Sequence, residues 1–81
     1  MNEIVRIHIA KVPFNIEMSA KKLLDAYLKA LETYLNDAEV FADIEQRIVE
    51  LLQERDIKTD GVIALADVEA IKNQLGEPEA F

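Results

Sequence analysis

The spacing of the apolar residues changes near residue 18, and this change constrains the fold more than any other feature of the chain. Up to that point apolar and polar residues alternate, which is typical of strands with one buried face. The expected buried faces of two such strands are Val5, Ile7 and Ile9, then Val12, Phe14 and Ile16. The sequence therefore predicts a β-hairpin over residues 3–17. Its turn near Ala10 and Lys11 has no Asn-Gly or Asp-Gly pair, so its type stays open.

Beyond residue 18 the apolar residues recur every three or four positions, which is typical of amphipathic helices. Three such stretches predict helices over about residues 19–36, 38–55 and 65–75. Ser19 is the expected N-cap of the first helix, and Asn36 and Asp37 separate the first two. Gly76 and Pro78 are expected to end the third helix.

A two-stranded hairpin is not stable alone, so its apolar face must pack on the helices. The expected fold is therefore a single α+β domain over residues 1–81, with a two-stranded antiparallel hairpin followed by three helices (ββααα). Val62 and Ile63 are expected to form either a very short strand or an extended lead into the third helix. Pro13 has no N–H, which favours a place at a sheet edge or a bulge.

Composition and charge narrow the possible functions of this domain. The chain has no cysteine, which excludes disulfides, thiolate metal sites and cysteine nucleophiles. It carries 16 acidic residues against 9 Lys and Arg, for a net charge of −7. This balance disfavours nucleic acid and anionic membrane surfaces, because both are themselves anionic. It favours solubility or a basic partner instead.

The sequence contains no recognisable catalytic constellation. His8 is the only histidine, and it falls on the polar face of the first predicted strand. The only glycines are Gly61 and Gly76, so a Gly-rich phosphate-binding loop is excluded. We therefore expect no catalytic residues, no enzyme activity and no cofactor.

The polar face of the second predicted helix is the expected partner-binding surface. It is rich in carboxylates and contains one arginine; the proposed contact residues are Asp43, Glu45, Arg47, Glu50 and Glu54. A simpler explanation is that Arg47 pairs along the helix with Asp43 or Glu50, which stabilises a helix by only a few tenths of a kcal/mol per pair. A third possibility is self-association into a homo-oligomer through apolar surface that the hairpin leaves uncovered.

An ion-binding alternative rests on residues 56–67, which have the outline of an EF-hand calcium loop. Asp56 would occupy position one of the loop, Asp60 position five, Gly61 the sharp turn at position six, and Asp67 position twelve. The match is weak, because Lys58 and Ala64 stand where oxygen ligands belong. The preferred interpretation is a polar loop with no metal.

Four stretches together resemble the N-terminal cytosolic domain of the phage shock protein C (PspC) family. They are residues 5–9 (VRIHI) with 13–17 (PFNIE), residues 20–28 (AKKLLDAYL), residues 43–52 (DIEQRIVELL), and residues 62–68 (VIALADV) with 74–78 (QLGEP). The sequence departs from the family in two places: the hairpin turn has no glycine, and Ala64 stands where a Ser or Thr cap is expected.

The resemblance implies a regulatory, protein-binding domain linked to envelope stress and transcriptional control in bacteria, and it supplies no catalytic residues. In that family a membrane-spanning segment follows the domain, so a span beyond Phe81 would be expected in a longer protein. The sequence contains no apolar stretch that approaches the roughly 20 residues a membrane span requires. The expected location is the cytoplasm, or the cytosolic face of the inner membrane if the chain belongs to a longer protein.

Overall fold

The computed structural model describes residues 3–80, which form an α+β fold of order ββααβα. The strands are β1 (Ile4–Ile9), β2 (Val12–Glu17) and β3 (Val62–Ile63). The helices are α1 (Met18–Leu35), α2 (Ala38–Glu54) and α3 (Leu65–Leu75), followed by a 3-10 turn, η1 (Pro78–Ala80). The hairpin and the three helices that the sequence predicts are confirmed.

The predicted order ββααα is incomplete, because residues 62–63 form a third strand. β3 pairs parallel with β2, so that Asn15 lies opposite Val62 and Ile16 opposite Ile63. The sheet order is therefore β1-β2-β3, with β2 in the centre. Of the two alternatives that the sequence left open for these residues, the short strand is therefore confirmed; a stretch of two residues is too short for its alternating pattern to decide between them. Its pairing depends on where the α2–β3 loop comes back to the hairpin.

Pro13 consequently lies in the central strand, and not in an edge strand. The antiparallel register places it opposite His8, and its carbonyl accepts a hydrogen bond from the Asp60 N–H on the side away from β1. Its nitrogen faces that same side, at a level that β3 does not reach. No ladder hydrogen bond to β1 is therefore lost at this position.

The β1–β2 turn consists of Ala10 and Lys11, both with positive φ, 49° and 69°. Positive φ at both central residues identifies a type I′ turn, whose twist matches that of the flanking strands. Type I′ turns favour Asn and Gly, so Ala10 and Lys11 adopt this conformation at a steric cost. The two-residue turn is retained because it keeps the apolar faces of β1 and β2 in register, and this packing outweighs the local steric cost.

The helix ends follow the sequence signals except at the start of α1. Asn36 ends α1 in the left-handed conformation, and the Asp37 side chain caps α2 by accepting from the N–H groups of Glu39 and Val40. The prediction that Ser19 caps α1 is wrong, because α1 begins one residue earlier and its N-cap is Glu17. The Ser19 Oγ is instead buried, with no hydrogen-bond partner among the described residues.

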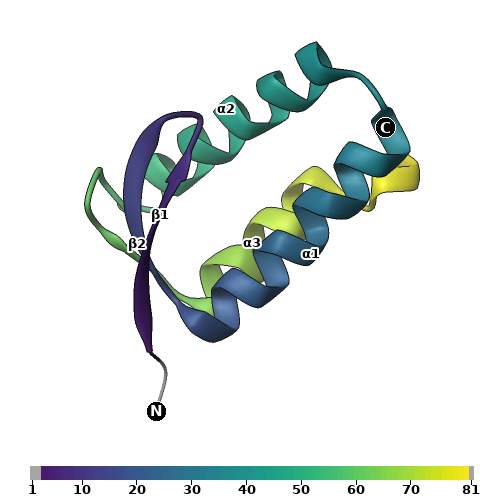
Figure 1. Ribbon diagram of the computed structural model, residues 1–81. Coiled ribbons are helices and arrows are strands. Elements are labelled where there is room, and N and C mark those ends of the chain that lie inside the picture. Colours follow the sequence, from purple (N-terminus) through teal and green to yellow (C-terminus); the bar gives the residue numbers. More distant parts are fainter. Residues whose placement is uncertain (1–2, 81) are drawn as a thin grey trace.

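The core lies between the inner face of the sheet and the helices. α1 and α3 run side by side, and α2 lies across from them, next to the hairpin (Figure 1). Phe14 and Ile16 from β2 meet Leu31 of α1 and Ile48 of α2 there, all fully buried. None of the helices within residues 3–80 is long and apolar enough to cross a lipid bilayer.

Candidate functional site

The structure divides the five predicted partner-binding residues between two sides of α2. Four of them follow a spacing of four, three and four residues, so they share one stripe of the helix: Asp43, Arg47, Glu50 and Glu54. All four are exposed, and we call this stripe the acidic face of α2. Glu45 is four residues after Phe41 and seven before Leu52, which places it on the opposite side, beside the buried stripe.

The acidic face contains one cation, which pairs within the helix. The Arg47 guanidinium lies 3.2 Å from the Glu50 carboxylate and 3.3 Å from that of Glu54. These side chains are about half exposed, at 48%, 49% and 60%. Exposed ion pairs of this kind contribute about 0.3–0.5 kcal/mol each. The pairing of Arg47 with Glu50 that the sequence suggested is therefore present, but it stabilises the helix only slightly.

Glu45 lines a second feature, a hollow of about 430 Å³ between α2 and the hairpin. We call it the hairpin hollow; its lining residues are His8, Ala10, Lys11, Ala42, Glu45 and Gln46. Glu45 is half-buried there, unlike the other four predicted residues. The signal for this separation was present in the sequence, because Glu45 directly follows Ile44 and precedes Ile48 by three, within the apolar side of the helix.

The three aspartates of the proposed calcium loop have separate structural roles. Asp56 is in the left-handed conformation directly after α2, where its N–H donates to the Gln53 carbonyl and the following Ile57 N–H donates to Leu52. These two bonds form a Schellman motif, and buried Ile57 completes it with an apolar contact. Asp56 therefore ends a helix, and this role requires no ion.

Asp60 and Asp67 each bind a different arginine. The Asp60 carboxylate pairs with Arg6 of β1, and its backbone carbonyl accepts from the Asn15 amide. The Asp67 carboxylate accepts from the Ala64 N–H at 2.9 Å and from Arg55 Nε at 2.9 Å. Asp67 thus forms one half of a capping box at the start of α3, by accepting the N–H of the N-cap residue, whereas Ala64, without a side-chain oxygen, cannot form the other half.

Tyr27 ties α1 to the end of α3. Its hydroxyl donates to the Gly76 carbonyl at 2.6 Å, and the Lys72 ammonium lies 5.5 Å from the centre of its ring. Burial, followed by the nearby Glu77 carboxylate, raises the pKa of Tyr27 above its ordinary value of 10.0. The hydroxyl therefore stays protonated as a donor at neutral pH, so we assign Tyr27 a structural role.

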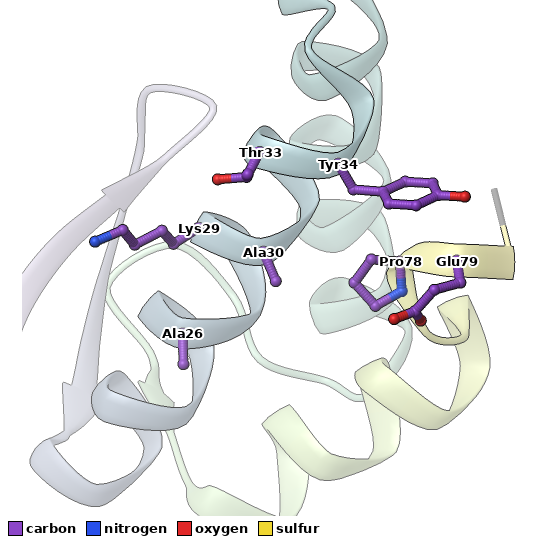
Figure 2. Close-up of a pocket in the computed structure, with 7 residues that line it drawn as sticks. All are labelled: Ala26, Lys29, Ala30, Thr33, Tyr34, Pro78 and Glu79. Atoms are coloured by element: carbon purple, nitrogen blue, oxygen red, sulfur yellow. The ribbon is translucent and has the colours of Figure 1, made fainter.

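A shallow apolar groove lies between α1 and η1. It has a volume of about 540 Å³ and is lined by Ala26, Lys29, Ala30, Thr33, Tyr34, Pro78 and Glu79. Figure 2 shows the Tyr34 ring at the η1 end of the groove, near Pro78 and Glu79, with the two alanines along α1. The groove has one cation and one anion, so its charge favours neither a basic nor an acidic partner.

No group of three or more His, Asp or Glu side chains within residues 3–80 is arranged to hold a metal ion. The structure therefore does not bring Asp56, Asp60 and Asp67 together as ligands. Comparison of the chain with known protein families, curated proteins and solved structures finds no match. The resemblance to the PspC family accordingly stays a prediction.

Proposed function

We propose that this domain is a non-enzymatic protein-interaction module that binds a basic surface of a partner protein through the acidic face of α2. The observation that carries the proposal is that three carboxylates, those of Asp43, Glu50 and Glu54, follow one exposed stripe with Arg47 as the only cation. Because the core packs against a different side of α2, these charges are not needed to bury or cap the helix.

The distribution of charge supports this assignment to α2 and not to another helix. α2 carries five carboxylates and one arginine, whereas α1 carries two carboxylates and three lysines. Most of the excess negative charge of the chain therefore lies on one element. Exposed charges of one sign speed up association with a surface of the opposite sign and make binding weaken at high salt.

The resemblance to the PspC family supports a regulatory role for this interaction. Under that proposal the domain acts in envelope-stress signalling at the cytosolic side of a membrane, and its partner is another protein of the same response. Capture of the partner through the acidic face is thus the first step to establish.

The double charge reversal Glu50→Lys and Glu54→Lys tests the acidic face. Wild-type protein on a solid support is expected to capture a basic protein from an extract of its native cells. Capture should decline as salt is raised from 50 to 300 mM, because the Debye length falls below about 10 Å in roughly this range. The E50K/E54K variant is expected to lose this capture while it keeps the circular dichroism of the wild type.

The matched control is Glu32→Lys with Glu69→Lys, two exposed carboxylates on α1 and α3 that form no ion pair in the described structure. It changes the net charge of the chain by the same amount. Retained capture by this control assigns binding to the acidic face. Equal loss from both variants would mean that total charge, and not this surface, governs the interaction, and unchanged capture by E50K/E54K would exclude the acidic face.

A further inference from the structure

β1 is an edge strand, and the pairing register shows which of its backbone groups are free. The two-residue turn makes Ile9 and Val12 a hydrogen-bonded pair, and such pairs alternate along an antiparallel ladder. The backbone N–H and C=O groups of Ile7 and Val5 therefore point toward β2. Those of His8, Arg6 and Ile4 point outward, away from β2. Consistently, Asn15 and Pro13, which lie opposite Arg6 and His8, bond to the α2–β3 loop on the far side of β2.

The outward-facing backbone of β1 has no hydrogen-bond partner among residues 3–80. Native proteins commonly protect such edges with a proline, a bulge or a lysine, and Ile4–Ile9 contains none of these. The strand's one charged side chain, Arg6, is directed across β2 to Asp60. The free edge is therefore open along the three outward-facing residues Ile4, Arg6 and His8, all of which are exposed.

The hairpin hollow lies beside this edge. The His8 side chain is on the outer face of the sheet, as its exposed position opposite Pro13 shows, whereas α2 packs on the inner-face side of the hairpin. The lining runs from His8 through the turn residues Ala10 and Lys11 to α2, so the hollow lies at the turn end of the β1 edge. Its volume of about 430 Å³ is within the range of sites that hold a ligand, and Glu45 forms part of its α2 wall.

We propose that the β1 edge binds an extended peptide segment of another protein, which adds a strand to the sheet and places a basic side chain in the hairpin hollow near Glu45. Three outward N–H and C=O pairs are complementary to the backbone of a strand. The hollow accepts a side chain from the inner face of that strand. Glu45 is half-buried in its α2 wall and forms no ion pair within residues 3–80, whereas Lys11, the one cation of the lining, is exposed to solvent at the turn, so a basic side chain of the peptide would supply the partner that Glu45 lacks. This surface is separate from the acidic face, so the two proposals stand independently.

A second copy of this chain would fit the edge less well. The inner face of β1 carries only Val5, Ile7 and Ile9, so β1 of another copy has no basic side chain to place near Glu45. Its one basic side chain, Arg6, is on the outer face and pairs with Asp60. The unpaired carboxylate of Glu45 thus favours a basic peptide over a second copy.

The test uses a phage library of random peptides of about eight residues, long enough to pair with a six-residue strand. The full chain is expected to enrich peptides in which apolar residues alternate with Lys or Arg. Addition of the synthetic winning peptide is expected to shift the amide resonances of residues 4–8 and 45, with those of residues 50 and 54 unchanged. In the bound peptide, every second backbone nitrogen faces β1. Methylation of one of these nitrogens is expected to weaken binding about tenfold or more, because it removes a hydrogen-bond donor. Methylation of a nitrogen that faces away from β1 is expected to leave binding unchanged.

Two variants of the protein test the same edge. His8→Pro removes an outward N–H without breaking the ladder to β2, and His8→Ala is its matched control. H8P is expected to weaken peptide binding about tenfold and H8A less than about twofold. Glu45→Lys is expected to abolish the preference for basic peptides while E50K/E54K keeps it.

The proposal is overturned if no peptide is enriched, if both sets of N-methylated peptides bind alike, or if the shifts fall on the acidic face. It is also overturned if light scattering detects a dimer whose formation protects the amides of residues 4, 6 and 8 from exchange, because a second copy would then occupy the edge. Should H8P fail to fold, the methylated peptides still decide the outcome with the unmodified protein.

Discussion

Of the connections in this molecule that run through left-handed backbone without glycine, two are supported very differently. The hairpin turn places Ala10 and Lys11 at positive φ, and the loop between α2 and β3 does the same with Asp56 and Asp60. In the loop, each aspartate sits within a set of backbone hydrogen bonds. At the hairpin turn, the only such support comes from the strands on either side.

The difference shows how a small domain accommodates unfavourable local conformations. Aspartate tolerates left-handed backbone better than alanine or lysine does, and the loop adds a Schellman motif and two bonds to β2. The α2–β3 loop is therefore a structural connector that joins the third strand to the sheet. The hairpin turn, which borders the hairpin hollow, is strained and is stabilised chiefly by the apolar register of β1 and β2.

The largest effect on stability is expected from Gly61→Ala, which lies in the α2–β3 loop. An added Cβ would lie 2.8 Å from the Lys58 carbonyl oxygen, a backbone atom that accepts the Gly61 N–H and cannot move freely. Overpacking of this kind, with loss of the Gly61 contact to Asn15, should lower the free energy of unfolding by about 3 kcal/mol. Urea denaturation measures it, with exposed Lys58→Ala as control; similar midpoints for both variants would show that the loop yields easily.

A smaller effect of opposite sign is expected at the hairpin turn. The double substitution Ala10→Asn and Lys11→Gly supplies the residues that a type I′ turn favours, so it should raise the free energy of unfolding by about 1–2 kcal/mol. Lys11→Ala keeps the strain while it removes the charge, and should leave stability unchanged within about 0.5 kcal/mol. If thermal unfolding shows no gain for the double variant, the turn is not strained in the way its φ angles indicate.

The ion pair between Arg6 and Asp60 should contribute less still. Both side chains are more than half exposed, at 51% and 58%, so solvent screens the pair. A double-mutant cycle with Arg6→Ala and Asp60→Asn should give a coupling energy below about 1 kcal/mol that declines with salt. Asparagine is chosen because it tolerates the positive φ of this position. A coupling several times larger would mean that the pair, and not the backbone bonds, anchors the loop to the hairpin.

The smallest effect, on the amide resonances of the α2–β3 loop, is expected from added calcium. Because the Asp60 and Asp67 carboxylates pair with different arginines, and no three carboxylates within residues 3–80 are grouped to hold a metal, millimolar calcium should leave the amide resonances of residues 56–67 unshifted. Magnesium at the same ionic strength is the control for general charge screening. Saturable shifts confined to residues 56–67 at micromolar calcium would restore the ion-binding alternative.

Much of the fold was predictable because its signals are local. The alternation up to Ile16 and the spacing of three and four from Leu23 to Leu35 correctly located the hairpin and α1, and Asp37 and Gly76 correctly marked helix ends. The failures occurred where local signals compete. Ser19 is a good N-cap in isolation, but the hairpin continues directly into α1, which begins at Met18 and leaves the Ser19 hydroxyl buried without a partner.

The candidate site was predictable only in part for a related reason. The sequence correctly indicated that Arg47 and Glu50 share a stripe, since i and i+3 residues of a helix are neighbours. It grouped Glu45 with them, because all are charged residues of one helix. The hairpin hollow depends on which side of α2 the hairpin packs against, and no pattern within α2 itself specifies that neighbour.

By itself, then, the amino-acid sequence determined the elements of this protein, their apolar faces and the concentration of negative charge on α2. These properties depend on residues a few positions apart, where backbone geometry is regular. Only the tertiary structure decided that Val62 and Ile63 join the sheet, that Asp60 reaches Arg6, and that β1 remains an open edge beside Glu45. Each of these depends on packing between distant segments, where the three-dimensional path of the chain, and not its local pattern, sets the contacts.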